Sequence, residues 1–422
     1  MDSRIKELMD VTKTRFGLDN YYLKRHGLDR YVNIFNETVY TLSMDWFPDH
    51  VEEPEDDSNP EGTAVIEVNV YSHKFVSAIF VMDKTYAKNG ISFAGLHTND
   101  IIKWMEQESG LTYGRQLQLH KEEEGRLLFK EVIDGVAVSP SGSVEIKFDE
   151  EGKLTLFAVH GQFPSKEIIK EETYKLSFEK VEHLAKEQLK LIEFPSHEQQ
   201  RLIPAYGVEE VYVTNDQMTT IPFEVIVDVR SYIKIDKTIF LDKTIKDPFE
   251  RKEFSWTEEV TVEQAFSSEQ SPDSYPITKK EQETCVLAVK DFLRQEYPDD
   301  SGIWILKTLH RNRGYIHATL RANKQDNRVF QRKLMVIIDA TSFQAVNYVD
   351  NKSMLEMFDQ FQAPDKVAID KEEAYKKLKE LFELKPYYVY DFEQKQYVLC
   401  GKLDCQYGVN ASSGKVIALN DL

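Results

Sequence analysis

Few residues of this chain have the types and spacing that catalysis requires. His197-Glu198-Gln199-Gln200 begins like the zinc-binding helix of metalloproteases, but the second His is absent and a metal would lack its ligand pair. His310-Arg311-Asn312-Arg313 offers cations for an anion, although a solvated turn is the stronger expectation in so acidic a chain. Ser139-Pro140-Ser141-Gly142-Ser143 lacks the strand-to-helix setting of a catalytic serine and is predicted to be a hairpin turn. We therefore assign no catalytic, cofactor-binding or metal-ligating residue.

The remaining sequence signatures of chemistry point the same way. The ten histidines show no pair at the spacing of four residues that one helix face would need, and the chain has no Gly-x-Ser-x-Gly element and no phosphate-binding loop. An acidic run, Glu52–Asp57, lies within an irregular stretch at 49–62. We predict that this stretch is a solvated loop inserted between strands. A weak divalent-cation site is the alternative, although the run lacks the spacing of a calcium loop.

Charge and composition exclude several classes of protein. The 422 residues include 72 acidic and 53 basic side chains, which gives a net charge of -19. That field repels phosphate backbones, so we expect no nucleic-acid partner. The chain shows no apolar leader and no stretch with the length of a membrane span. This favours a cytoplasmic protein as the chain stands, or an extracellular one if a leader has been removed.

The three cysteines do not indicate a disulfide framework, because their number is odd and small. Cys285 falls on the apolar face of a predicted helix, where a free thiol behaves as a small hydrophobe. Cys400 and Cys405 are five residues apart in a strand-like stretch. They would lie on opposite faces of a regular strand, which favours neither a zinc pair nor a disulfide.

Five amphipathic helices are predicted from apolar residues at spacings of three and four. They begin near Ile5, after Thr98, at Ser177, after Thr278 and after Asp370, and the last two beginnings carry capping-box patterns. We expect the first to end at Gly17, the third before Pro195, the fourth at Pro298 and the fifth at Pro386, and the second to turn Ile101, Trp104 and Met105 inward.

Between these helices the apolar period changes to two, which indicates antiparallel strands with one covered face and one wet face. The alternating stretches are 66–70, 144–148, 223–229 and 316–320. Hairpin turns are predicted where an apolar run meets Asn, Asp or Gly, and Gly152 is expected to have a positive φ. The predicted turns lie at 81–85, 148–152, 213–216, 338–341 and 409–414.

The chain therefore reads as a helix followed by strands, five times over. We predict an α+β fold of tandem units, each with one helix packed on an antiparallel sheet, arranged in two lobes. The polar, aperiodic stretch Ser267–Ser274 is the predicted boundary. An N-terminal lobe at 1–266 would hold three units, and a C-terminal lobe at 275–422 would hold two.

Aromatic side chains are densest at Tyr387–Phe392. Strand residues of this type usually pack on a sheet face, which is the expected role here. The alternative is an exposed recognition surface, because Tyr is common at interfaces.

The last predicted unit, Tyr397–Ile417, resembles the strand-turn-strand end of a PepSY-type unit, which typically closes with a Val-Asp-Ala-x-Thr-Gly-Glu-Val-like hairpin. Leu202–Val213 is similar to the strand that precedes such a hairpin. The tandem layout is similar to that of the bacterial YcdB/YcdC repeat proteins. Three residues depart from the pattern: Asn410, Ser413 and Lys415 stand where Asp, Thr and Glu are usual. Met218-Thr219-Thr220 also stands where the third unit would carry Gly.

The resemblance implies a binding role and transfers no catalytic residue, because PepSY-type units are associated with binding or restraining peptidases. We therefore expect a non-enzymatic protein that binds or regulates a protein or peptide, with a peptidase as the implied partner. Two alternatives stay open. One is a small-molecule-binding protein or an enzyme with a site of scattered acidic and His residues, and the other is a structural cell-surface component.

Overall fold

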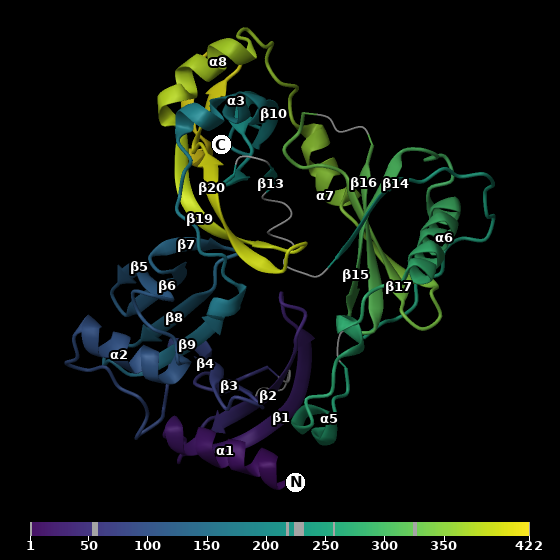
Figure 1. The fold of residues 1–422 in the computed structure, drawn as a ribbon. Helices are drawn as coiled ribbons and strands as arrows, with labels where there is room; N and C mark the ends of the chain where they lie inside the picture. Colours follow the sequence, from purple (N-terminus) through teal and green to yellow (C-terminus); the bar gives the residue numbers. More distant parts are fainter. Residues whose placement is uncertain are drawn as a thin grey trace. The chain divides into compact units, whose positions relative to one another are not determined.

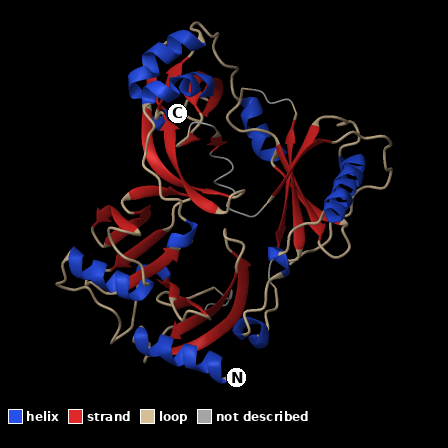
Figure 2. Ribbon diagram, viewed as in Figure 1, coloured by secondary structure: helices blue, strands red, loops and turns tan. Residues whose placement is uncertain are grey.

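The structure is a computed structural model, and it describes residues 2–52, 58–216, 219–222, 232–255, 258–323 and 327–421. The chain forms two compact units in which helices pack against antiparallel strands (Figures 1 and 2). This confirms the predicted α+β class. Unit 1 is made of Met1–Lys170, Thr257–Ser274 and Tyr388–Tyr397. Unit 2 is made of Glu171–Trp256, Tyr275–Tyr387 and Val398–Leu422.

The two units are interleaved along the sequence. The chain passes from unit 1 to unit 2 after Ser274, at the end of the polar stretch that suggested a boundary. Residues 171–256, which the sequence placed in the N-terminal lobe, belong to unit 2, and the short segment 388–397 belongs to unit 1.

Unit 1 is built on one antiparallel sheet with a continuous order of neighbouring strands. The order is β1 (Tyr21–Val32), β2 (Thr38–Pro48), β3 (Ala64–Asn69), β4 (Phe75–Phe80), β9 (Leu154–His160), β8 (Ser143–Phe148), β6 (Arg126–Ile133) and β7 (Val136–Ser139), followed by the tip of a hairpin formed by β19 (Glu383–Asp391) and β20 (Gln396–Asp404). In addition, β5 (Leu117–Glu123) pairs with β6.

Two long helices cover this sheet. In α1 (Ser3–Arg15), the carboxylate of Asp2 accepts a hydrogen bond from the amide of Arg4, and Gly17 follows the helix with a φ of +64°. The second helix, α2 (Thr98–Ser109), ends at a left-handed Gly110. Both bury the apolar faces that the sequence indicated, against fully buried strand residues such as Leu42, Met44, Ile66 and Phe129.

Unit 2 contains two further hydrophobic cores. The first lies under α3 (Phe178–Gln188) and α8 (Lys371–Leu378). Its strands are β10 (Leu189–Ser196), β11 (Arg201–Val208), β21 (Tyr407–Asn410) and β22 (Val416–Ala418) in one sheet, and β12 (Val211–Thr214) and β13 (Thr220–Pro222) beside β20.

The second core of unit 2 lies between α6 (Lys279–Glu296) and a five-stranded sheet. Thr278 and Glu281 close the predicted capping box of α6, and Cys285 is fully buried on its inner face. The strands follow chain order: β14 (Ile233–Thr238), β15 (Trp304–Asn312), β16 (Tyr315–Ala322), β17 (Lys333–Asp339) and β18 (Ala345–Asp350). The short helix α7 (Lys352–Glu356) follows β18.

Two predicted helix ends are wrong, for the same physical reason. The third helix stops at Gln188, and Leu189 already has the extended backbone of β10, with Pro195 inside that strand. The fifth helix stops at Leu378, and Pro386 lies inside β19. Proline has no N–H group and is tolerated at strand positions that need no N–H donor. Pro195 and Pro386 lie inside strands, so neither proline marks the end of a helix.

The predicted turn at 81–85 is also wrong. Val81–Asp83 forms a single 3-10 turn after β4, and Met82 in it has a φ of +62°. The hairpin that joins β3 to β4 lies earlier, where the amide of Asn69 donates to the carbonyl of Lys74. The alternating stretch at 223–229 and the residue Met218 lie outside the described residues.

A six-residue turn recurs at four hairpins of the described chain. In each turn, the Oδ1 atom of an Asn or Asp accepts hydrogen bonds from the backbone amides two and three residues later. The residue four positions later has a positive φ. These turns begin at Asn69, Asp339, Asp391 and Asn410. Two of the four are turns that the sequence predicted, at 338–341 and 409–414, and the Asp149 turn keeps its Gly152 at a φ of +79° with a shorter loop.

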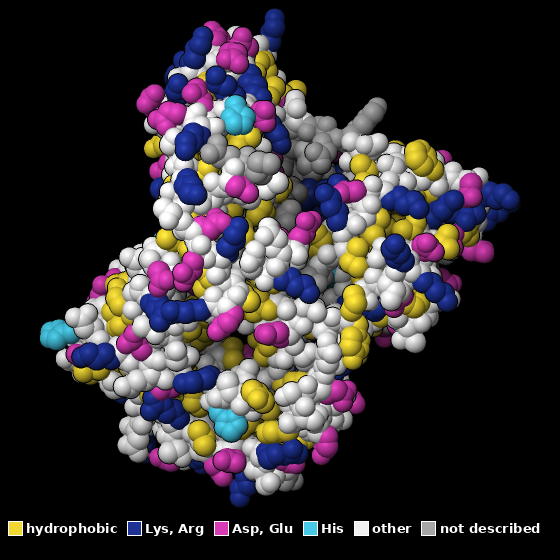
Figure 3. Space-filling view, viewed as in Figure 1, with side chains coloured by type: hydrophobic (Ala, Val, Ile, Leu, Met, Phe, Trp, Pro, Cys, Tyr) yellow, Lys and Arg dark blue, Asp and Glu magenta, His cyan; other side chains and the backbone are white. Residues whose placement is uncertain are grey.

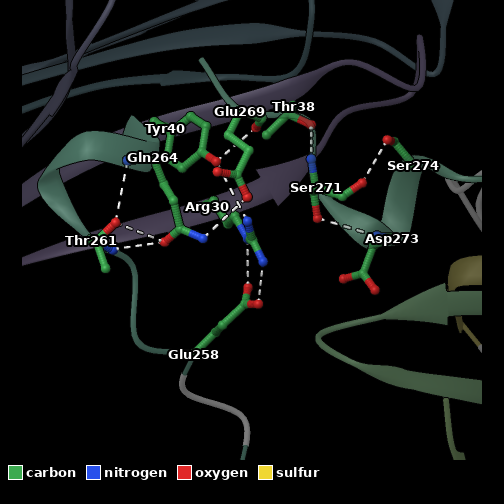
Figure 4. Close-up of polar contacts among 10 residues, drawn as sticks. All are labelled: Arg30, Thr38, Tyr40, Glu258, Thr261, Gln264, Glu269, Ser271, Asp273 and Ser274. Carbon is green, nitrogen blue, oxygen red and sulfur yellow. Dashed lines mark hydrogen bonds and ion pairs between the residues drawn. The ribbon is translucent and has the colours of Figure 1, made fainter. Parts of the chain in front are cut away.

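The polar stretch near 267–274 is packed onto unit 1 (Figure 4). The guanidinium of Arg30 on β1 forms a two-bond ion pair with Glu258, and its side chain is only 6% exposed. The hydroxyl of Tyr40 on β2 donates to the carbonyl of Glu269 at 2.7 Å. The amide of Ser271 donates to Thr38 at 2.8 Å. The sequence did not predict the short helix α5 (Val262–Phe266), which buries Ala265 in the core of unit 1.

The alternating sequence predicted one buried and one exposed face for β16, and this prediction is wrong. Ile316, Ala318 and Leu320 are fully buried as expected, but His317 and Thr319 on the opposite face are buried as well. The solvated turn predicted at 310–313 is also wrong, because residues 310–312 belong to β15. His310 is buried in β15, and Arg311 is paired with Glu281 of α6.

Candidate binding pocket

The residues singled out for chemistry in the sequence do not come together. His197 lies in the turn between β10 and β11, where its ring packs edge-on against Phe361. The acidic residues Glu53–Asp57 lie outside the described residues. Cys285, Cys400 and Cys405 are buried cysteines. Among the residues that the structure describes, no group of three His, Cys, Asp or Glu side chains is arranged to hold a metal ion.

An open sheet edge could bind an added strand, but two sheet edges in unit 2 are already partly hydrogen-bonded to other segments of the chain. The outer edge of β10 is contacted by a returning segment, because the amide of Glu193 donates to the carbonyl of Asn327 and the amide of Val329 donates to that of Glu193. At β18, the amide of Lys252 donates to the carbonyl of Val346. These two edges already use backbone groups that an added strand would need.

A pocket of about 210 Å³ opens in unit 1 at the end of β6. Its lining includes Glu131, Val132 and Ile133 of that strand. The segment before β5, the turn after β6 and the 163–169 loop contribute the other lining residues. The further lining residues are Arg115, Gln116, Asp134, Phe163, Pro164, Ser165, Lys166 and Ile169.

Backbone hydrogen bonds hold the walls of the pocket. The amide of Val132 donates to the carbonyl of Gln116 at 2.9 Å, which extends the pairing of β5 with β6. The 163–169 loop is attached at its end, where Ile169 forms a parallel bridge with Tyr397 and the amide of Lys170 donates to the carbonyl of Tyr397. The pocket is therefore bordered by backbone that is fixed on two sides.

Glu131 is the unusual residue of this site, because a carboxyl group is only 1% exposed there. The amide of Gly142 donates to its Oε2 at 2.6 Å. Its Oε1 has no hydrogen-bond partner among the described residues. Burial raises the pKa of Glu131 to about 8, and the Gly142 hydrogen bond only partly opposes that rise. The carboxyl group is therefore mostly neutral at pH 7.

Glycines make this arrangement possible. A Cβ on Gly142 would lie 2.9 Å from Glu131 Oε2 and 2.9 Å from the ring of Phe163. A Cβ on Gly161 would lie 2.6 Å from the Cα of Gly142. The start of β8 and the end of β9 thus approach each other without side chains between them.

The surroundings of Glu131 also include a buried phenol. Tyr397 is fully buried on β20, and its hydroxyl has no hydrogen-bond partner among the described residues. Burial, followed by the charge of Glu131, raises the pKa of Tyr397. Its ring packs against Tyr390, which confirms that the aromatic cluster of β19 packs on a sheet face.

Charged groups surround the mouth of the pocket. Arg115 and Lys166 are exposed cations, and the Asp134 carboxylate lies 3.7 Å from Arg115. The local balance is positive in a chain whose overall charge is -19. On the face seen in Figure 3, acidic and basic side chains are interspersed, with hydrophobic side chains scattered between them.

The sequence analysis missed Glu131, although a signal for it exists. Along β6, the alternation places Glu131 in phase with Leu127 and Phe129, which are 2% and 0% exposed. A charged residue at an inward position of a strand either needs a partner or becomes neutral. Gly142, its partner, lies in the stretch predicted as a hairpin turn. That prediction is wrong, because the stretch joins β7 to β8, and the amide of Glu131 donates to the carbonyl of Gly142 as an extension of the β6–β8 ladder.

Comparison with known proteins adds little to this geometry. No family model matches the chain, and no curated protein matches it. Among solved structures, the Bacillus megaterium YpeB C-terminal domain matches with a TM-score of 0.24 and 8% sequence identity, over 83% of this chain and 97% of that chain. A similarity of that size supports no conclusion about function. No helix in the described parts of the chain is long and apolar enough to cross a membrane.

Proposed function

We propose that this protein is a non-enzymatic binding protein that holds a peptide, or a segment of a partner protein, in the Glu131 pocket. The pocket itself is the observation that supports this proposal. Its volume of about 210 Å³ lies below the range of roughly 300–1,000 Å³ that is usual for drug-sized ligands and cofactors. It suits one side chain or one chain end, with the rest of the ligand extending over the surface.

The mixed lining of the pocket is consistent with a peptide. Phe163, Pro164 and Ile169 offer apolar surface, while Arg115 and Lys166 offer charge at the mouth. Pockets of this composition gain affinity from the apolar area and orientation from a few polar groups.

We further propose that the chain is a PepSY-like repeat protein of the YcdB/YcdC type and that its partner is a peptidase. The recurrence of one turn geometry at Asn69, Asp339, Asp391 and Asn410 supports a repeated build. The partner class rests on the sequence resemblance of Tyr397–Ile417 alone.

A second candidate function has one observation in its favour. A carboxyl group with a pKa raised to about 8, in a pocket with nearby charges, is a common feature of small-molecule sites and of general acids. In that case the pocket would bind a small ligand by itself, and a peptide context would add no affinity.

Screening a pool of random short peptides against the purified chain tests the proposed function. Ser165→Trp places a large ring in the pocket lining, whereas Thr112→Trp adds the same ring to an exposed residue on the neighbouring segment. Peptides retained by the native chain and by Thr112→Trp, but lost with Ser165→Trp, would support binding at this pocket. Equal retention by all three proteins, or no retained peptide, would contradict it. A screen of small metabolites by thermal shift then tests the second candidate.

A further inference from the structure

The outer edge of β1 is open, unlike the two partly occupied edges of unit 2. β1 is the first strand of the unit 1 sheet and pairs with β2 on one side (Figure 1). Residues 24–27 are exposed, and a Cβ on Gly27 would have no heavy atom within 4 Å. Among the described residues, none forms a hydrogen bond with the backbone of His26 or Leu28 outside the ladder with β2. An added strand can therefore reach this edge.

The pairing register shows which backbone groups of β1 point away from β2. The amide of Val70 donates to the carbonyl of Tyr40, so Tyr40 directs its backbone groups toward β3. Arg30, which lies opposite Tyr40, must then direct its own N–H and C=O outward. The register has no shift between residues 25 and 32, so His26 and Leu28 also direct these groups outward. The open edge thus presents a regular row of donors and acceptors.

The charges of this strand are placed symmetrically about Gly27. Arg25 lies two residues before Gly27 and Asp29 lies two residues after it, and all three face the same side of the sheet. The Nε atom of Arg25 donates to the Asp45 carboxylate of β2 at 2.9 Å, which holds the guanidinium at this edge. The strand is therefore complementary in charge to an antiparallel copy of itself.

One register uses this complementarity. When Gly27 lies opposite Gly27, Arg25 of each copy lies opposite Asp29 of the other. A shift of two residues leaves neither charge opposite an opposite charge, and a shift of four places Arg25 opposite Arg25 or Asp29 opposite Asp29. Opposite charges that face each other across an antiparallel pair stabilise it, and like charges destabilise it.

We propose that the outer edge of β1 binds a second copy of this chain as an antiparallel strand, with the two Gly27 residues facing each other at a two-fold axis. His26 of each copy then exchanges backbone hydrogen bonds with Leu28 of the other. Gly27 lies at a closely spaced pair, where the absence of a side chain lets the two strands approach. This inference does not depend on the Glu131 pocket or on the proposed function.

Sedimentation velocity of the full chain, over about a hundredfold range of concentration, tests the association. We expect a reversible dimer with a Kd of about 1–100 µM, because an interface of one strand is small. His26→Pro removes an outward N–H and leaves the ladder with β2 intact, so it should weaken the dimer at least about tenfold. His26→Ala keeps the N–H and should change the Kd by less than about threefold. Equal hydrogen exchange of β2 in the two variants confirms that both are folded.

A charge swap between two copies tests the register. Arg25→Glu and Asp29→Arg should each be monomeric, because each variant places like charges opposite each other. Mixing the two variants restores both ion pairs and should restore the dimer in a one-to-one ratio. Lys6→Glu, on an exposed residue of α1, changes the net charge as much as Arg25→Glu does and should dimerise as the native chain does.

A cysteine at the axis gives a covalent readout. Gly27→Cys should cross-link to its own copy with oxidised glutathione as the oxidant, because directly opposed residues meet the distance that a disulfide requires. Tyr31→Cys lies four residues from the axis and should not cross-link. The native cysteines are buried and serve as the background.

Three outcomes would overturn the inference. The first is a native chain that stays monomeric at every concentration, including one whose β1 edge instead binds peptides that His26→Pro releases. The second is a dimer that His26→Pro leaves unchanged, which would place the interface elsewhere. The third is a mixture of Arg25→Glu and Asp29→Arg that stays monomeric, which would reject the register about Gly27.

Discussion

The amide nitrogen of Gly142 lies 2.6 Å from Oε2 of Glu131 and is the hydrogen-bond donor to this buried carboxyl group. The same two residues are joined a second time, because the amide of Glu131 donates to the carbonyl of Gly142 at 2.9 Å. The side-chain contact thus extends a backbone ladder, and β6 and β8 fix the position of the carboxyl group before any ligand arrives.

The stability of unit 1 should depend on the protonation of Glu131. Its pKa is about 8 in the folded chain and about 4.3 in an unfolded one. The folded state therefore holds one more proton between these values, and the free energy of unfolding falls as pH rises, by about 1.4 kcal/mol per pH unit. The contribution is complete below pH 4.3 and is lost once the pH passes 8.

Glu131→Gln isolates this effect, because the amide is neutral at every pH. Relative to the native chain, we expect the variant to gain stability steadily from pH 5 to pH 8 and to remain level above that. Hydrogen exchange of peptides from β6, corrected for the intrinsic rate, reports it locally. The exposed Glu124→Gln is the matched control. A difference between the native chain and Glu131→Gln that does not change with pH would show that the acid is ionised in the folded state.

A methyl group at Gly142 should destabilise the pocket. The added Cβ would meet Glu131 Oε2, the Phe163 ring and the carbonyl of His160 at 2.9–3.1 Å, so at least two of these groups must shift. Gly142→Ala should cost about 1–3 kcal/mol in the free energy of urea unfolding. Gly27→Ala on β1 is the control, because a Cβ there has no heavy atom within 4 Å. It should be neutral or stabilise by a few tenths of a kcal/mol, and equal costs at the two sites would contradict the steric argument.

Local signals in the sequence predicted the elements well where one interaction decides the structure. The Thr278–Glu281 capping box and the Gly17 stop define helix ends through contacts within a few residues. The turn residues Asp339 and Asn410 act through their own neighbouring amides. Pattern and chemistry agree at these positions because both are local.

Non-local pairing limited the rest of the prediction. The stretch 267–274 was predicted as a boundary, but the segment 258–274 makes contacts, such as those of Glu258 and Ser271, with strands more than 200 residues earlier. The pocket depends on Gly142 and Glu131, which are eleven residues apart, and on the 163–169 loop that Tyr397 anchors. No periodicity in one sequence records which distant strand a segment joins, so the site could not be assembled from the sequence alone.

The ion pair between Arg30 and Glu258 should hold the 258–274 segment on unit 1. Arg30 is 6% exposed and Glu258 is 31% exposed, so the pair is far less screened than a surface pair. Arg30→Met should cost about 2–3 kcal/mol and should increase hydrogen exchange in 258–274. Arg25→Met, which removes a 47%-exposed partner of Asp45 from the same strand, should cost less than about 1 kcal/mol. If the two variants protect 258–274 equally well, the buried pair does not anchor the segment.

The turn at Asp339 should accept asparagine but not alanine. Its Oδ1 accepts hydrogen bonds from the amides of Thr341 and Ser342, and Asn410 makes the same two contacts in its own turn. Asp339→Asn keeps the acceptor and should change the free energy of unfolding by less than about 0.5 kcal/mol at pH 7, whereas Asp339→Ala should cost about 1–2 kcal/mol.

The dependence of stability on pH in the acidic range gives a second test of the same turn. Burial acts to raise the pKa of Asp339, but the hydrogen bonds from Ser342 and Thr341 outweigh it and lower that pKa below its ordinary value. The carboxylate therefore contributes stability above about pH 3.9, and this contribution is lost as the pH falls through the lower folded value. Hydrogen exchange of β17 and β18 between pH 6 and pH 3 should show the advantage of the native chain over Asp339→Ala shrinking, while Asp339→Asn keeps its stability. A constant advantage down to pH 3 would mean that the charge of Asp339 has no part in the turn.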